Sequence, residues 1–395
     1  MDTLLHTPDG VRDIYGHECA MKDLIEEHVL RTLKSFGYDR IETPTFEFFD
    51  IFNQERGSVS SREMYKFFDR DNNTLVLRPD ITPAIARCVT KFFREETQPV
   101  RLCYLGNTFL NSVNYTGRLK EISQSGAELI GDSTADADTE MVLMTVECLK
   151  AAGLTDFHVE IGEVDFYRGI VEAAGLTEEE DRELRELIEN KNSFGVEEFA
   201  EAHVGDRRIR ECFIRLPMLF GGIGDISAAR ALTDSPRALA AIERLEKIAE
   251  IIDIYGLAGY VSFDLGMLSQ YEYYTGMIFK AYSYGTGDYL VNGGRYDRLL
   301  SQFGTDRPAV GFAVRIDSVL SCIMSQKISL PVEKTGALVV YRKRHTARAA
   351  ALIRKMRLEG KRVAAQLWDD RVSDDEYRAY AERNGIRELI LMKED

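Results

Sequence analysis

Three stretches of the chain bring together side chains that could hold a small ligand. They are residues 78–83 (RPDITP), residues 101–131, and the aromatic run of residues 271–279 (YEYYTGMIF). In the first stretch, Asp80 offers a carboxylate and Thr82 a hydroxyl to a polar ligand. A structural role is the alternative, because either side chain could cap a helix over residues 83–93. Aromatic side chains on a strand likewise pack more often in a core than around a ligand.

Other residue types that often carry chemistry are not arranged for it. Residues 218–222 (MLFGG) lack the Lys-Ser/Thr pair of a phosphate-binding loop, so we interpret them as a turn. The cysteines form no C-x-x-C pair, which argues against a zinc site or a disulfide framework and favours reduced cytosolic thiols. They are Cys19, Cys88, Cys103, Cys148, Cys212 and Cys322. We therefore expect neither a metal nor a cofactor.

Regular elements must position these stretches. Residues 101–106 alternate like a strand, Gly117-Arg118 is a turn, and a return strand carries Gln124 and Glu128. The pattern also predicts a helix at 18–36, a strand region at 38–49 broken by Pro44, and a hairpin at 63–77. Further on it predicts a helix at 132–152, a strand at 157–161 and a mostly helical region to about residue 256. In that region Thr177 and Glu180 form a capping box.

The last part of the chain has a pattern of its own. After a linker at 325–335, strands at 337–341, 362–367 and 388–392 alternate with helices at 346–360 and 374–384. This β-α-β-α-β order predicts a small parallel sheet.

In order and kind, these motifs resemble a class II aminoacyl-tRNA synthetase of the histidyl type. The helix at 18–36 and the strand region at 38–49, taken together, resemble motif 1. Residues 101–131 resemble motif 2 and 308–313 motif 3, while 293–297 (GGRYD) and 271–279 resemble histidine-specific signatures. The resemblance implies an α+β fold, with an antiparallel sheet flanked by helices in a core at 1–324. It also implies a helical insertion at about 164–256, and a partial anticodon-binding-like α/β domain at 336–395. Motif 1 implies a self-dimer.

The same resemblance implies which residues contact histidine. Asp80 and Thr82 would bind its ammonium group, and four further side chains would surround the ammonium and imidazole groups. These four are Gln124, Glu128, Tyr273 and Tyr274.

The arginines that hold ATP phosphates in this family are replaced. Their positions are Leu110, Ser269 and Ser318, and a neighbouring Glu position is Ser112. Each lost cationic donor costs on the order of 10²–10³ in rate, and a leucine cannot compensate for desolvation of phosphate charge. We therefore expect no catalytic residues and no amino-acid activation.

A pocket for an amino acid without the means to activate it resembles the family of ATP phosphoribosyltransferase regulatory subunits. That resemblance implies a short catalytic subunit as partner, L-histidine as effector, and feedback control of the first step of histidine biosynthesis. Two alternatives remain. One is a histidine–tRNA ligase in which displaced arginines replace the lost ones. The candidates are Arg118, Arg295 and Arg315, and Arg315 could share a helix face with Ser318. The other is a tRNA-binding paralogue that uses a basic C-terminal region.

The charge and hydrophobicity of the chain limit which ligands and locations we expect. The 395 residues carry a net charge of −15, which argues against a nucleic-acid surface over the whole molecule. From Pro331 onward, however, 15 Lys and Arg face 11 Asp and Glu, or +4. No apolar run is long enough to span a bilayer, and residues 1–10 do not resemble a secretory signal. We therefore expect a cytoplasmic protein without a membrane partner, for which nucleic acid is an improbable ligand.

Overall fold

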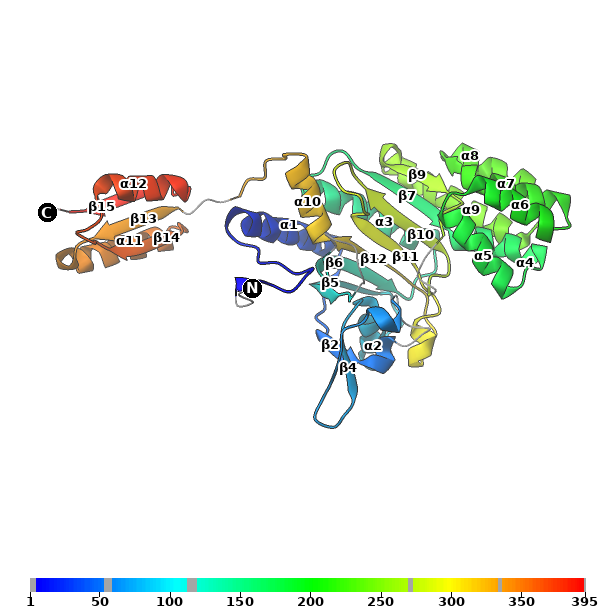
Figure 1. The fold of residues 1–395 in the computed structure, drawn as a ribbon, viewed down its shortest axis with the longest axis horizontal. Helices are drawn as coiled ribbons and strands as arrows, with labels where there is room; N and C mark the ends of the chain where they lie inside the picture. The colour runs from blue at the N-terminus through cyan, green and yellow to red at the C-terminus, as the bar shows by residue number, and fades with distance from the viewer. Residues whose placement is uncertain (1–4, 53–58, 112–118, 269–272, 333–335, 394–395) are drawn as a thin grey trace. The chain divides into compact units, whose positions relative to one another are not determined.

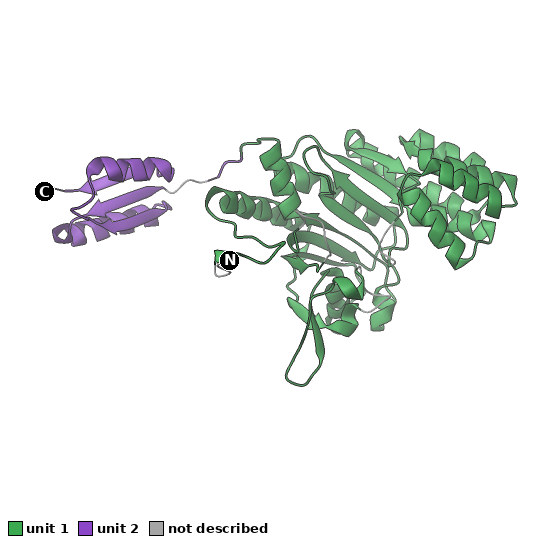
Figure 2. Cartoon of the chain, viewed as in Figure 1, with its two compact units in different colours: residues 1–329 green, residues 330–395 purple. Residues whose placement is uncertain are grey.

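The computed structural model describes residues 5–52, 59–111, 119–268, 273–332 and 336–393. The chain divides into two compact units, residues 1–329 and residues 330–395 (Figure 2). The first unit contains the stretches that could bind a ligand. No helix in the described residues is long and apolar enough to cross a membrane.

A nine-stranded sheet forms the centre of the first unit (Figure 1). Its strands pair antiparallel, except that β1 with β5 and β7 with β9 run parallel. In spatial order they are β1 (Asp39–Arg40), β5 (Val100–Phe109), β6 (Glu121–Ile130), β12 (Ala309–Arg315), β11 (Val291–Arg295), β10 (Met277–Tyr282), β7 (His158–Glu163), β9 (Val261–Asp264) and β8 (Phe220–Gly221). The predicted hairpin of motif 2 is confirmed as β5 and β6, while its turn lies outside the described residues.

Helices cover the two faces of this sheet unequally. Helices α1 (Gly16–Ser35), α3 (Ala135–Ala151) and α10 (Ile316–Ser325) pack on one face, against β5, β6 and β12. Helix α2 (Thr82–Phe92) lies on the other face, where Ile81, Ile85 and Val89 join a buried cluster with residues of β5 and β6. The predicted helices at 18–36, 83–93 and 132–152 are confirmed within three residues at either end.

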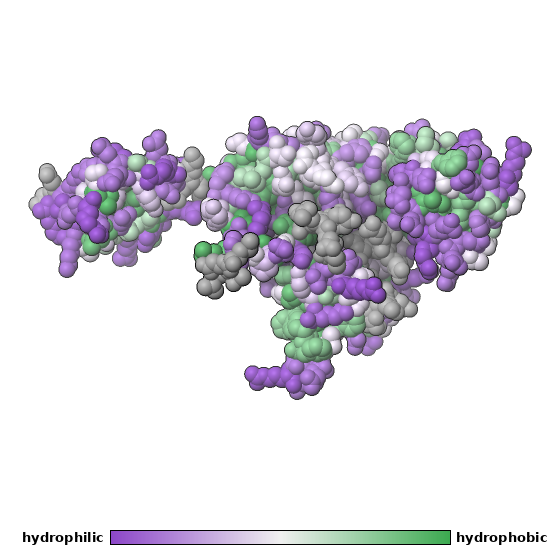
Figure 3. Space-filling model, in the orientation of Figure 1, coloured by the Kyte–Doolittle hydropathy of each residue, from purple (hydrophilic) through white to green (hydrophobic). Residues whose placement is uncertain are grey.

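A second, three-stranded sheet lies beside α2 (Figure 1). It consists of β2 (Phe46–Phe48), β4 (Thr74–Leu77) and β3 (Lys66–Phe68), all antiparallel. Pro44 separates β1 from β2, so the strand region at 38–49 contributes to both sheets. The outward side of this small sheet is apolar, because Phe46 and Phe48 are each 54% exposed (Figure 3).

The mostly helical segment inserted after β7 is confirmed. It contains α4 (Val164–Ala174), α5 (Glu178–Glu189), α6 (Ser193–His203), α7 (Arg207–Arg215), α8 (Ile223–Ala228) and α9 (Pro236–Ile254). The capping box of α5 is formed by Thr177 and Glu180, as predicted. Residues 218–222, predicted as a turn, instead contain the short strand β8, which pairs with β9.

The second unit has the predicted β-α-β-α-β order. Its elements are β13 (Ala337–Tyr341), α11 (Thr346–Leu358), β14 (Val363–Leu367), α12 (Asp374–Arg383) and β15 (Glu388–Met392). Strand β13 lies between β14 and β15 and is parallel to both.

Another local prediction was wrong. The aromatic run at 271–279 is not one strand: β10 begins at Met277, and Tyr273 and Tyr274 precede it. Contacts in a pocket hold these two side chains, and these contacts outweigh strand propensity.

Candidate functional site

The six side chains expected to contact histidine line a single pocket on the α2 face of the sheet. The pocket also contains residues to which no role was assigned from the sequence. The lining consists of Val59, Pro79, Asp80, Thr82, Tyr104, Thr108, Leu110, Ile122, Gln124, Glu128, Tyr273, Tyr274, Tyr289, Asn292, Tyr296, Gly311, Phe312, Ala313 and Arg315. Two carboxylates, one guanidinium and several phenols therefore face one small volume.

The floor of the pocket is the strand pair β6 and β12. Glu128 lies opposite Gly311 and Gln124 lies opposite Arg315, so alternate residues of both strands face the pocket. Gly311 has to lack a side chain, because a Cβ atom there would overlap the Oε2 atom of Glu128. The glycine of motif 3 thus makes room for the Glu128 carboxyl group.

Glu128 is the buried centre of a hydrogen-bond network. This residue is only 1% exposed. The hydroxyl of Thr82 donates to Oε1 over 2.7 Å, and the hydroxyl of Tyr296 donates to Oε2. Burial raises the pKa of Glu128 to about 8, although both hydroxyl donors oppose this shift. A ligand that brings a positive group or an N–H donor into the pocket would favour the carboxylate.

Asp80 forms the second acidic position. Its Oδ2 accepts a hydrogen bond from the Tyr273 hydroxyl over 3.2 Å, and its Oδ1 accepts one from the backbone N–H of Thr82 over 3.1 Å. The helix-cap alternative therefore applies in part to Asp80. It does not apply to Thr82, since this residue is the first of α2 and its hydroxyl is directed to Glu128.

Tyrosines form one wall of the pocket. The rings of Tyr273 and Tyr274 meet edge to face with their centroids 4.9 Å apart, and Tyr273 meets Tyr296 in the same way at 5.9 Å. The Tyr274 hydroxyl accepts from Asn292 Nδ2 over 3.4 Å. A flat aromatic group of a ligand could pack against these rings.

The family arginine positions lie in different places. Leu110 lines the pocket as an apolar residue directly after β5. Ser318 lies in the first turn of α10 and is not part of the lining. Ser269 and Ser112 lie outside the described residues, as does Arg118.

The expectation that Arg315 and Ser318 share a helix face is wrong. Strand β12 continues through Arg315, and α10 begins only at Ile316. Because Arg315 alternates with Gly311 and Ala313, its side chain lies in the pocket.

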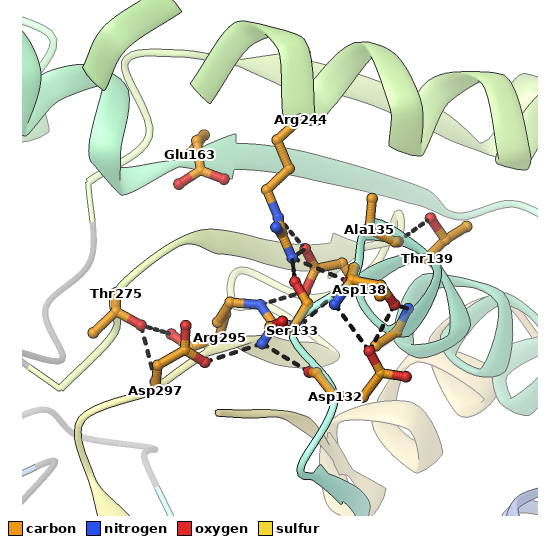
Figure 4. Close-up of polar contacts among 12 residues, drawn as sticks. Asp132, Ser133, Ala135, Asp138, Thr139, Glu163, Arg244, Thr275, Arg295 and Asp297 are labelled. Atoms are coloured by element: carbon orange, nitrogen blue, oxygen red, sulfur yellow. Dashed lines mark hydrogen bonds and ion pairs between the residues drawn. The ribbon is translucent and has the colours of Figure 1, made fainter. Parts of the chain in front are cut away.

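Arg295 forms ion pairs in a buried network on the face of β11 that points away from the pocket (Figure 4). Its Nη2 lies 2.7 Å from Asp138 Oδ1, and its Nη1 lies 3.0 Å from Asp297 Oδ1. Asp138, which is fully buried in α3, also pairs with Arg244 of α9 at 2.5 Å. The network therefore fixes the loop that carries Tyr296 and joins the inserted helices to the core.

Sequence reasoning missed Tyr296, Tyr104 and Asn292. Tyr296 belongs to the GGRYD motif, so a signal was present, but no role was assigned to that tyrosine. Tyr104 and Asn292 lie at alternating strand positions that resemble ordinary core residues. The described residues contain no group of three or more His, Cys, Asp or Glu side chains arranged to hold a metal ion.

The fold and this pocket define a class II aminoacyl-tRNA synthetase-like protein of the histidyl type. The sequence profile of the histidyl-tRNA synthetase family matches residues 10–319. The crystal structure of histidyl-tRNA synthetase from Nostoc sp. PCC 7120 superposes with a TM-score of 0.81, covering 97% of this chain and 90% of that one. Its sequence identity is 19%, so this likeness concerns the fold alone. The predicted fold class is confirmed.

Two further comparisons are more specific. The ATP phosphoribosyltransferase regulatory subunit of Acetivibrio thermocellus is 36% identical over 391 residues, which cover 99% of this chain and 93% of the relative. A crystal structure described as an ATP phosphoribosyltransferase regulatory subunit/histidyl-tRNA synthetase from Bacillus halodurans has a TM-score of 0.89. It is 30% identical and covers 99% of both chains. The chain belongs to the family of ATP phosphoribosyltransferase regulatory subunits, as its motifs predicted.

Proposed function

We propose that this protein is a regulatory subunit without catalytic activity of its own. A short catalytic ATP phosphoribosyltransferase subunit carries out the first step of histidine biosynthesis, and this protein activates that subunit. L-histidine in the pocket described above transmits feedback inhibition. Membership of the family supports the regulatory role, and the six free cysteines are consistent with work in a reducing cytoplasm.

The observation that carries this proposal is the preassembled amino-acid site. Asp80 and Glu128 are held by the hydroxyls of Tyr273, Thr82 and Tyr296 before any ligand arrives. These acceptors suit an ammonium group and an imidazole N–H, and the tyrosine rings suit a flat aromatic side chain. Because the groups are already oriented, binding needs little side-chain ordering.

The same pocket offers poor support for ATP. Adenylation develops charge on phosphate oxygens, which requires fixed cationic donors. Leu110 contributes an apolar side chain, and Arg295 is bound to Asp138 on the other face of the sheet. Arg315 is therefore left as the one cationic donor among the described lining residues. These features favour a sensor of histidine over a ligase with displaced arginines.

We also propose that two copies pair through the motif 1-like region, residues 18–49. Strand β2 buries Glu47 and leaves Phe46 and Phe48 exposed on its outward side, which a second copy could cover (Figure 3). A Phe46→Ser/Phe48→Ser double variant should then shift the protein to a smaller species in light scattering. An unchanged mass would argue against this interface.

Reconstitution tests the function directly. The full chain, mixed with the short catalytic subunit of the same organism, should raise phosphoribosyltransferase activity well above that of the catalytic subunit alone. Histidine-dependent exchange of pyrophosphate into ATP by this protein alone should be flat. No activation, together with clear exchange, would instead identify a histidine–tRNA ligase.

A further inference from the structure

A free α-amino acid carries a carboxylate as well as an ammonium group, and the pocket has to bind both. The acidic side chains Asp80 and Glu128 suit the ammonium and imidazole groups. A cationic donor, above all an arginine, forms the strongest hydrogen bonds to a carboxylate. Among the described residues that line the pocket, Arg315 is the only cationic one.

Arg315 lies at the opposite end of the pocket floor from Glu128. On β6 and β12, the pair Glu128–Gly311 is followed by Gly126–Ala313 and then by Gln124–Arg315. Four residues along a strand span roughly 14 Å between Cα atoms. This distance can accommodate the two side chains, Glu128 and Arg315, with an amino acid of histidine size between them.

The guanidinium group of Arg315 is held in position and still has donors available. Its Nη1 pairs with Asp288 Oδ2 at 2.5 Å, and its Cζ atom lies over the Tyr289 ring, 4.9 Å from the ring centre. Within the described part of the chain, Nε and Nη2 form no hydrogen bond, and the side chain is 17% exposed. Asp288 and Tyr289 thus orient the group without using all of its N–H donors.

Arg78 also lies near the pocket, but it cannot bind the carboxylate of the ligand. Arg78 is 6% exposed and is not in the lining. Its Nη1 donates to the carbonyl of Thr43 over 2.8 Å, and its Nε donates to that of Asn107 over 2.7 Å. Arg78 therefore connects backbone segments and does not face the ligand.

We propose that Arg315 is the carboxylate-binding residue of this pocket. The site then selects a free amino acid over an amine of the same shape, or over an amino acid whose carboxyl group is blocked. This inference rests on the proposed function, in which the pocket holds histidine. It adds a second charged end to the site and defines the class of ligand that the subunit senses.

Calorimetric titration of the full chain with L-histidine and with histamine tests this inference. Histamine keeps the imidazole and the ammonium group but has no carboxylate. The wild-type protein should bind histidine roughly 10- to 100-fold more tightly than histamine, the worth of one or two charge-assisted hydrogen bonds. Arg315→Gln should remove most of this preference and leave histamine binding unchanged within about twofold.

Two further variants serve as controls. Arg298→Gln makes the same charge change at an exposed residue outside the pocket lining and should leave both affinities as they are. Arg315→Lys keeps a cation and should retain part of the preference, even if Arg315→Gln folds poorly. Equal weakening of both ligands, or equal affinity of the wild type for both, would overturn the role of Arg315. A wild type that binds neither ligand would contradict the proposed function itself.

Discussion

Replacing Glu128 by Gln should make the stability of the isolated subunit less sensitive to pH. Glu128 is almost fully buried, and burial raises its pKa from 4.5 to about 8. When the pKa of a group is higher in the folded state than in the unfolded state, its contribution to the free energy of unfolding is fully present below the unfolded-state pKa. This contribution is lost as pH rises from the unfolded-state pKa through the folded-state pKa. The wild-type protein should therefore lose stability between about pH 5 and pH 8.

The magnitude follows from the pKa difference. One pKa unit corresponds to about 1.4 kcal/mol, so Glu128 lowers the free energy of unfolding by about 2 kcal/mol between pH 6 and pH 8. Glu163 acts in the same direction, because burial raises its pKa to about 8 as well. Glu128→Gln should remove about half of the pH-dependent loss, and a Glu128→Gln/Glu163→Gln double variant should remove nearly all of it.

Urea denaturation of the isolated subunit at pH 6, 7 and 8 measures this effect. Glu147→Gln is the matched control, because its carboxylate on α3 is 44% exposed. The control should follow the wild-type pH profile. The reasoning is refuted if Glu128→Gln shows the same loss of stability between pH 6 and pH 8 as the wild type.

Three other substitutions have defined outcomes. Tyr273→Phe removes the hydroxyl that donates to Asp80, so calorimetry should show histidine affinity lower by roughly tenfold; an unchanged affinity would contradict a role for this contact. Gly311→Ala places a methyl group on the Glu128 carboxyl, so histidine binding should be lost in the same titration while the circular dichroism spectrum is kept; wild-type affinity would count against the pocket. Asp138→Asn leaves Arg244 and Arg295 without their shared carboxylate, so the free energy of unfolding in urea should fall by about 3–5 kcal/mol. A loss below about 1 kcal/mol would mean that the network is not needed for stability.

Local sequence patterns were enough to predict most elements of the fold. The apolar spacing of α1 and α3, the hairpin of β5 and β6, and the capping box at Thr177 depend on neighbours in the sequence. The tyrosine pair was placed on a strand because aromatic residues favour strands. Contacts with Asp80 and Asn292, which come from distant segments, hold the pair ahead of β10.

The lining of the pocket was predictable where a motif contained its residues. The resemblance indicated Asp80, Thr82, Gln124, Glu128, Tyr273 and Tyr274, and all six line one pocket. The role of Arg315 was not accessible from the sequence, because it depends on whether β12 or α10 contains that residue. The network of Asp138 with Arg244 and Arg295 joins residues more than 100 positions apart, and no local pattern indicates such a pairing.

The most direct test of the proposed sensor is the histidine dependence of the reconstituted enzyme. The activity of the catalytic subunit is measured against histidine concentration, with either wild-type protein or Glu128→Gln present. The wild-type protein should activate the enzyme and make it sensitive to histidine, whereas Glu128→Gln should activate it and leave it much less sensitive. Equal inhibition by histidine with both proteins would show that the effect does not pass through this pocket.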